Sequence, residues 1–150
     1  MKHMIGLAAL AFALASGSAS AQQINVKIGV LTDMSSLYAD ATGQGSVIAA
    51  RMAAADFMKD HPNVKAEVLV GDHQNKPDIG SQIANQWFDV DHVEMIVDVP
   101  NSGVALAISQ IAGQKNKVFV GSGPASSDLT GPKCNANTVH WTYDTWMLAN

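Results

Sequence analysis

Short apolar runs alternate with longer segments of helical periodicity along most of this chain, and this alternation restricts the folds that it can adopt. The runs are rich in valine and isoleucine, as strands are when a sheet is buried on both faces. They cover residues 26–31, 66–70, 95–99 and 118–120. Strands that alternate with helices form parallel sheets, so the sequence predicts an α/β fold, a parallel sheet with helices on both faces.

Three segments between these runs have the periodicity of amphipathic helices. The first spans about residues 43–60 and stops before Pro62. The second begins near Pro77, and the third begins near Ser102, which we interpret as its N-cap. The stripes expected to be buried are Ile48, Met52 and Ala55 in the first helix, Ile79, Ile83 and Trp87 in the second, and Val104, Ile108 and Ile111 in the third. Their spacing indicates packing in a core rather than a cofactor-binding function.

Residues 1–21 have the features of a signal peptide for export. A basic Lys2 precedes a short apolar run, and small residues lead up to Ala21, where an Ala-x-Ala pattern predicts cleavage. The run is too short to span a bilayer. Removing 21 of the 150 residues leaves 129, which is enough for one hydrophobic core but not for two. We therefore expect residues 22–150 to form one domain, or lobe, in the periplasm.

The composition restricts the partners of the chain. The 9 lysine and arginine residues are outnumbered by 13 aspartate and glutamate residues, and this acidic balance argues against binding to nucleic acid. No second apolar stretch is long enough for stable insertion into a membrane. The single cysteine, Cys134, leaves two hypotheses open: a disulfide with a cysteine beyond residue 150, or an inert buried thiol.

No motif in the chain indicates catalysis. The sequence has neither a G-x-S-x-G nucleophile elbow nor a phosphate-binding loop, and Gly43 and Gly45 lack the third glycine of a dinucleotide fingerprint. Asp72 and His73 are adjacent, but no nucleophile or metal accompanies them, so we prefer a hydrogen-bonding role at a strand end or hinge. The scattered histidines form no ligand pair. We therefore expect no enzyme, no metal site and no cofactor.

The loops after the predicted strands are the candidate binding region. Right-handed connections place the carboxyl ends of parallel strands and the N-termini of the following helices along one edge, where backbone N–H groups favour anions. The loops are residues 32–43, 71–75, 100–103 and 121–131. Expected hydrogen-bonding residues are Ser35, Ser36 and Tyr38 in the first loop, Ser102 in the third and Ser126 in the fourth. An ordinary helix cap at Ser102 and a merely flexible fourth loop are the alternatives.

Together, these loops and the export signal resemble the periplasmic branched-chain amino acid binding proteins, the type I solute-binding proteins of ABC importers. The resemblance covers residues 26–150 and is carried by residues 27–36, 43–46, 71–76, 126–131 and 138–144. It implies two α/β lobes that close on a small solute and deliver it to the membrane subunits of an ABC transporter. It also implies that this chain is the N-terminal lobe, truncated before the second lobe, and that the protein is a monomer.

The resemblance further implies which residues bind the solute. In this family the N-terminal lobe holds the ligand's carboxylate through hydroxyl groups and backbone amides. Carried onto this chain, the implied ligand-binding residues are Tyr38, Ser102, Gly123, Ser126 and Tyr143. Tyr38 would pack against the ligand. Tyr143, like Trp141, lies near the lobe crossover and would either line the cleft or pack beneath the hinge.

The resemblance leaves the solute open. Amino-acid binders of this family hold the ligand's ammonium with an acidic group from the second lobe, and Pro124 in the fourth loop has no amide hydrogen to offer a ligand. Aromatic or other organic acids and amides are therefore expected solutes beside leucine and valine. The alternative function is a ligand-binding sensor domain of a receptor or signalling system, because the same fold serves there too.

Overall fold

Strands and helices alternate in the structure as predicted, with a further strand and a short helix at the end. This computed structural model describes residues 22–150, so the predicted export signal, residues 1–21, lies outside the described residues. The elements in chain order are β1 (Ile24–Thr32), α1 (Gly43–Asp60), β2 (Val64–Asp72), α2 (Pro77–Asp89), β3 (Met95–Asp98), α3 (Ser102–Lys115), β4 (Val118–Gly121), the 3-10 turn η1 (Ser127–Leu129), β5 (Thr138–His140) and α4 (Thr145–Ala149). The predictions missed β5 because a three-residue strand is too short to show alternation.

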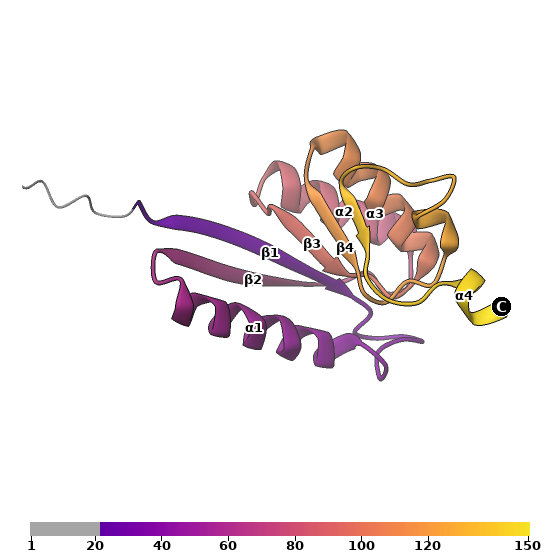
Figure 1. Cartoon of the computed structure of the whole chain (residues 1–150), viewed down its shortest axis with the longest axis horizontal. Coiled ribbons are helices and arrows are strands. Elements are labelled where there is room, and N and C mark those ends of the chain that lie inside the picture. The colour runs from indigo at the N-terminus through magenta and orange to yellow at the C-terminus, as the bar shows by residue number, and fades with distance from the viewer. Residues whose placement is uncertain (1–21) are drawn as a thin grey trace, which may run out of the picture.

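The strands form one parallel sheet in the order β2-β1-β3-β4-β5. α1 lies against β1 and β2 on one face, whereas α2 and α3 pack together on the other (Figure 1). Helices therefore cover both faces, as predicted. The chain passes from β1 to β2 on one side and then returns to β3 on the other side of β1. The carboxyl ends of β1 and β3 flank this switch point, where α/β proteins bind ligands.

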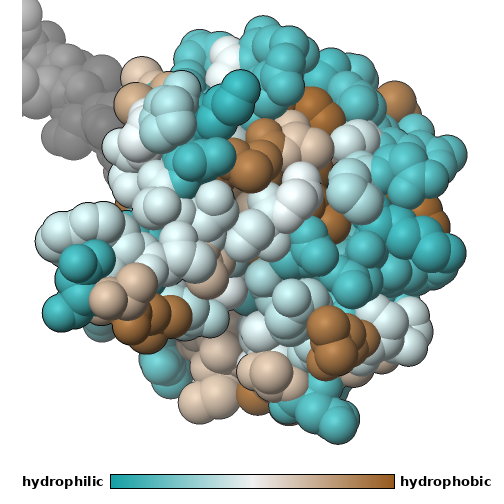
Figure 2. All heavy atoms as spheres, turned by 90° about the vertical axis from the view of Figure 1, so that its right-hand side faces the viewer, coloured by the Kyte–Doolittle hydropathy of each residue, from teal (hydrophilic) through white to brown (hydrophobic). Residues whose placement is uncertain are grey.

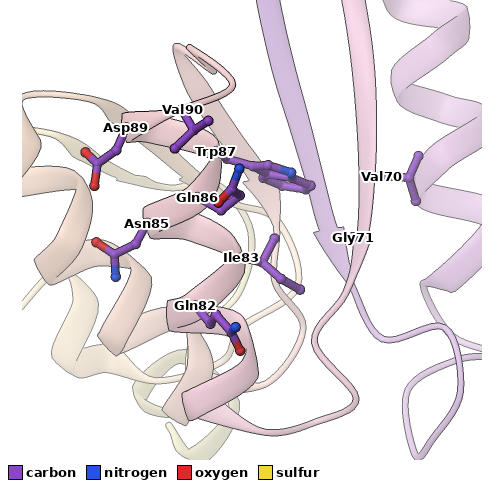
Figure 3. A pocket seen from close by; sticks show the side chains of 9 residues that line it. All are labelled: Val70, Gly71, Gln82, Ile83, Asn85, Gln86, Trp87, Asp89 and Val90. Atoms are coloured by element: carbon purple, nitrogen blue, oxygen red, sulfur yellow. The ribbon is translucent and has the colours of Figure 1, made fainter.

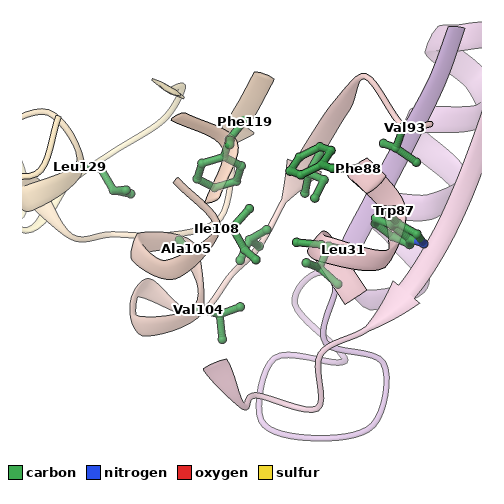
Figure 4. Close-up of a cluster of buried hydrophobic side chains, with 13 residues drawn as sticks. Leu31, Trp87, Phe88, Val93, Val104, Ala105, Ile108, Phe119 and Leu129 are labelled. Carbon is green, nitrogen blue, oxygen red and sulfur yellow. The ribbon is translucent and has the colours of Figure 1, made fainter. Parts of the chain in front are cut away.

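The hydrophobic core lies between the sheet and the helices α2 and α3 (Figure 4). Ile96 of β3 and Phe119 of β4 are partners in the sheet register, and neither has exposed surface. Trp87 of α2 lies directly on the strands: a Cβ atom added to Gly29 or Gly71 would be 2.4 or 2.9 Å from its ring. This close approach requires glycine at both positions and fixes α2 against the sheet.

In the predicted stripes of α2 and α3, Trp87, Val104 and Ile108 are buried and the other members are partly buried, whereas the predicted stripe of α1 is wrong. Ile48 and Met52 expose 51% and 62% of their surface, and Ala55 is exposed as well. The helix instead buries Gly43, Val47 and Ala54. The two stripes differ by one residue, a rotation of about 100°. Because apolar residues surround most of α1, their spacing does not select a face, and contact with β1 and β2 decides it.

Candidate functional site

A hollow at the carboxyl edge of the sheet gathers residues from the loops after β1, β3 and β4 and from the segment before α4. Its volume is about 340 Å³, and its lining residues are Tyr38, Ala41, Thr42, Pro100, Ser102, Ser122, Gly123, Ala125 and Tyr143. The structure thus brings together four of the residues that the resemblance singled out, Tyr38, Ser102, Gly123 and Tyr143. The α4 end of the molecule faces the viewer in Figure 2, where small apolar areas are separated by polar surface.

The Ser102 hydroxyl joins the third loop to the fourth. Its Oγ accepts hydrogen bonds from the N–H groups of Ala125 and Ser126, both at 3.2 Å. A hydroxyl oxygen that accepts twice keeps its own hydrogen, so Ser102 remains a donor. The predicted N-cap at Ser102 is wrong by one position, because the Asn101 side chain accepts from Val104 N–H and caps α3. The Ser102 side chain does not cap the helix and is therefore available for hydrogen bonds with the fourth loop.

Gly123 packs its backbone against the turn that follows β3. A Cβ atom here would lie 2.8 Å from Cα of Pro100 and 3.3 Å from Oδ1 of Asp98, so a side chain does not fit without movement. The turn itself is strained, because Asp98 and Val99 have φ angles of +81° and +59°. Such conformations cost on the order of 1–3 kcal/mol each in residues other than glycine. Gly123 therefore presents backbone, rather than a side chain, to the hollow.

A buried carboxylate shapes the first loop and places Tyr38. Asp33 has no exposed surface and accepts hydrogen bonds from Ser36 Oγ at 2.6 Å, Ser36 N–H at 3.0 Å and Tyr38 N–H at 2.9 Å. Burial raises the pKa of Asp33, but the hydrogen bonds favour the charged form more strongly and leave the pKa below its ordinary value of 3.8. Asp33 thus holds the Tyr38 backbone in place as an ionised acceptor.

Asp72, at the end of β2, ties the first loop to the neighbouring strand. Its carboxylate accepts from Met34 N–H at 3.0 Å, Ser35 Oγ at 2.7 Å and Gln74 N–H at 2.8 Å. Burial raises the pKa of Asp72, and these hydrogen bonds outweigh that effect and lower it. This agrees with the hydrogen-bonding role at a strand end that the sequence favoured for Asp72. Sequence reasoning missed Asp33 as a loop anchor, although an aspartate beside serines after a strand is a recognised turn signal.

In the structure, the hydroxyl groups of Ser35 and Ser36 already have acceptors and are not free donors. Each hydroxyl donates to one of the two carboxylates, and neither residue lines the hollow. The physical reason is competition: an ionised carboxylate nearby is a stronger acceptor than a neutral partner. The first loop therefore contributes Tyr38, Ala41 and Thr42 to the hollow, and its serines stabilise the loop itself.

His73 is fully buried beside Asp72 but is not part of the hollow. The backbone N–H of His73 donates to the Thr32 carbonyl at 3.0 Å, and the ring Nδ1 accepts from the backbone N–H of Asn75 at 3.0 Å. Burial lowers the pKa of His73, and the nearby carboxylates oppose this shift without cancelling it. The ring is thus neutral with its hydrogen on Nε2, which has no partner among the described residues. This geometry fits the strand-end role that the sequence favoured.

Of three further predicted positions, Tyr143, Trp141 and Ser126, only the first lines the hollow. Tyr143 lines the hollow, whereas Trp141 is 73% exposed and does not. Packing of Trp141 beneath a hinge stays a prediction. Ser126 also lies outside the lining: its Oγ accepts from Asp128 N–H at 3.3 Å and caps η1. Which hydroxyls of a loop face inward depends on its conformation, and composition does not reveal this.

Cys134 is exposed, so the hypothesis of a buried thiol is wrong, and the disulfide stays a prediction. Within residues 22–150 there is no cluster of side chains suited to hold a metal ion. In the same range, no helix has the length and apolar character that a membrane crossing requires.

Two larger hollows lie away from the carboxyl edge. One of about 850 Å³ lies between β2 and α2, and one of about 760 Å³ lies beside α3. In the first, Ile83 and Trp87 point toward the strands, whereas Asn85 and Asp89 point away from them (Figure 3). Neither hollow contains a residue of the first or fourth loop, so the loop donors converge only on the smaller one.

Solved structures that share this fold include periplasmic binding proteins and solute-binding proteins of ABC transporters. A periplasmic binding protein from Burkholderia mallei is 43% identical with a TM-score of 0.78, over 83% of this chain and 33% of its own. A branched chain amino acid ABC transporter periplasmic ligand-binding protein from Burkholderia xenovorans is 38% identical with a TM-score of 0.73, over 79% and 32%. A solute-binding protein of an ABC transporter from Rhodopseudomonas palustris, in complex with 3,4-dihydroxybenzoic acid, shares the fold at 21% identity and a TM-score of 0.65, over 80% and 32%.

The family profile described as periplasmic binding protein matches residues 25–150. The chain therefore belongs to the periplasmic binding protein family, and its five-stranded parallel sheet is that of the type I fold. The family consists of solute-binding proteins, which are not enzymes. The chain spans about a third of the length of the solved relatives that it matches. No curated protein sequence matches the chain.

Proposed function

We propose that this chain is the ligand-holding lobe of an extracytoplasmic solute-binding protein that delivers a small organic acid to an ABC importer. The observation that carries the proposal is the convergence of two hydrogen-bond donors on one hollow. The Ser102 hydroxyl keeps its hydrogen, and the Gly123 N–H makes no hydrogen bond to the described residues. Tyr38 and Tyr143 add aromatic surface to the same hollow. Donors beside aromatic walls suit a carboxylate attached to an apolar body.

The hollow offers neutral donors and a helix end rather than a charged side chain. None of its lining residues is lysine or arginine, and none is aspartate or glutamate. The 14-residue helix α3 begins at Ser102, and the partial positive charge of a helix N-terminus stabilises an anion. A carboxylate therefore fits here, whereas the ammonium of an amino acid needs a partner outside these lining residues. We assign that partner to a second lobe.

The proposed solutes are amino acids and aromatic or other organic acids of small size. The volume of about 340 Å³ is near the lower end of the range for small-molecule pockets, roughly 300–1,000 Å³. The Burkholderia xenovorans relative, 38% identical, is described as a branched chain amino acid transporter's ligand-binding protein. That description supports leucine, isoleucine and valine as the first candidates. The apolar Ala125 and the two tyrosines suit either an aliphatic or an aromatic body.

The proposed location of the protein is the periplasm, and its proposed partners are the membrane subunits of the transporter. Residues 1–21 direct the chain to the periplasm and are cleaved, and residues 22–150 form the first of two lobes. Solute binding shifts the equilibrium between open and closed lobes, and the membrane subunits of the transporter bind the closed form. The relatives' greater length supports a second lobe, because this chain spans only about a third of it.

Calorimetric titration of the complete protein tests the proposal. The probes are L-leucine, L-valine, benzoate and benzamide. We expect a carboxylate probe to bind, and we expect Ser102→Ala to weaken that binding about tenfold, because one charge-assisted hydrogen bond is lost. Ser81→Ala is the matched control: Ser81 lies at the start of α2, donates to the Pro77 carbonyl at 2.7 Å and is remote from the hollow. The control should bind as the parent does.

Uptake by cells separates an importer from a sensor. Deletion of the gene should abolish high-affinity uptake of the bound solute, and the parent gene should restore it whereas the Ser102→Ala gene should not at low solute concentration. Unchanged uptake together with a lost signalling response would favour the sensor alternative. Binding that is insensitive to Ser102→Ala would move the site away from this hollow.

A further inference from the structure

The segment that runs from β5 to α4 is bonded along the fourth loop. Trp141 N–H donates to the Gly121 carbonyl at 2.9 Å, and Thr145 N–H donates to the Ala125 carbonyl at 2.7 Å. Between these backbone contacts lie two side-chain contacts. Thr142 Oγ1 donates to the Ser122 carbonyl at 3.0 Å, and His140 Nε2 donates to the Pro124 carbonyl at 2.7 Å. The carbonyl groups of the loop are thus turned toward residues 140–145.

A trans peptide plane links the direction of each carbonyl to that of the next N–H group. In such a plane the C=O of one residue and the N–H of the following residue point in opposite directions. Carbonyls turned toward residues 140–145 therefore send the following N–H groups the other way. The fourth loop shows this twice: the planes whose carbonyls belong to Pro124 and Ala125 direct the N–H groups of the next residues to Ser102 Oγ, both at 3.2 Å.

The same geometry determines the direction of the Gly123 N–H. The plane between Ser122 and Gly123 has its carbonyl bonded to Thr142, so its N–H points away from Thr142. Gly123 lines the hollow, and its N–H makes no hydrogen bond to the described residues. Because glycine has no side chain that limits rotation of its backbone, Gly123 does not by itself hold this plane in one orientation. Its orientation depends on the hydroxyl of Thr142.

We propose that Thr142 and His140 are positioning residues for solute binding, although neither lines the hollow. Thr142 aims the Gly123 N–H at the solute, and His140 holds the peptide plane whose N–H fixes Ser102 Oγ. The proposal rests on the proposed function, since it names the residues that orient the donors of that site. It identifies residues 140–142, at and just after the end of β5, rather than the loop itself, as the segment that sets the affinity for a carboxylate.

Paired substitutions in the complete protein test this assignment. Thr142→Val and His140→Leu remove the donors, whereas Thr142→Ser and His140→Gln keep one. L-Leucine and benzoate are titrated against each variant. We expect the first pair to lose about tenfold in affinity and the conservative pair to stay within about twofold of the parent. Thr130→Val is the matched control, because its hydroxyl donates to the Ser127 carbonyl at 3.3 Å in the same loop, outside the hollow.

Hydrogen exchange provides a readout that needs no solute. In ¹⁵N spectra of the unliganded protein, the Ala125 amide should exchange about tenfold faster in His140→Leu than in the parent, and its rate should be restored in His140→Gln. Equal exchange rates in His140→Leu and the parent would overturn the positioning role. So would equal losses of affinity in the conservative and the disruptive variants. If neither probe binds the parent, the proposed function fails for both solute classes, whereas the exchange result still tests how the loop is oriented.

Discussion

The first and fourth loops border the same hollow but are held in different ways. The first loop wraps around two ionised carboxylates, Asp33 and Asp72, which lie at or just beyond the ends of adjacent strands. The fourth loop is held by hydroxyl, imidazole and backbone groups of Ser102 and of residues 140–145. One loop is thus stabilised from within by charge, and the other is stabilised from outside by a later segment of the chain.

Because they are held differently, the two loops should respond differently to acid and to amino-acid substitution. Carboxylates that are bonded in their charged form lose stabilising power when they are protonated, so the first loop should respond to pH. The fourth loop is fitted between the strained turn after β3 and the segment after β5. It should respond to changes in volume and to lost donors. The following substitutions test that contrast.

Gly123→Ala should have the largest effect. The new Cβ atom meets Cα of Pro100, a backbone atom that cannot move aside cheaply, so we expect a loss of about 2 kcal/mol in unfolding free energy and more than tenfold in solute affinity. Urea unfolding and titration measure the two effects. Gly45→Ala is the control: a Cβ atom there meets nothing within 4 Å, and the helix should gain stability. Equal behaviour of the two variants would contradict the tight fit of the fourth loop.

Asp33→Ala should have the second-largest effect, because it destabilises the first loop. It removes the acceptor of the Ser36 hydroxyl and of the Tyr38 N–H, and unpaired buried donors cost about 1–3 kcal/mol. Thermal unfolding of this variant is compared with that of Asp40→Ala, an exposed aspartate in the same loop. We expect a clear decrease in Tm only for Asp33→Ala. A stable Asp33→Ala variant would mean that the carboxylate does not organise the loop.

Acid should loosen the first loop before the fourth. Asp33 and Asp72 have pKa values lowered by folding, so their stabilisation is present above the unfolded value, about 3.9, and is lost as pH falls through the lower folded value. The lowered pKa of His73 adds an earlier loss, because the unfolded chain takes up a proton below pH 6.5 and the buried ring does not. The Tyr38 amide resonance should therefore shift only as the pH falls below about 3.9, while that of Ala125 stays constant, as ¹⁵N spectra can show. A simultaneous shift of both would remove the contrast between the loops.

Ser126→Ala should have the smallest effect. Ser126 caps the short η1 turn and lies outside the hollow, so we expect a loss of about 0.5–1 kcal/mol in stability and no change in solute affinity. Unfolding and titration of the variant measure both quantities. A tenfold loss of affinity would restore Ser126 as a ligand-binding residue and show that the fourth loop adopts another conformation when solute binds.

Much of the architecture could be predicted because the hydrophobic periodicity of most segments agrees with the way in which the fold buries them. The valine-rich runs became β1 to β4, and the stripes around Trp87 and Ile108 proved to be core. The third and fourth loops were also predicted to meet, since parallel strands bring their carboxyl ends to one edge. The prediction of the buried stripe of α1 failed for the opposite reason: apolar residues lie on most faces of this helix, so their spacing does not indicate which face is buried.

The sequence by itself determined the parallel α/β sheet, the edge at which the loops gather and Ser102 as a candidate, and its resemblance to a known family added Gly123. Only the tertiary structure decided which groups in those loops remain free. Ser35 and Ser36 are used by carboxylates, whereas the Gly123 N–H is directed into the hollow by a residue that comes 19 positions later, Thr142. The physical reason is that periodicity reflects local burial, while the direction of a donor depends on competing partners brought together by folding.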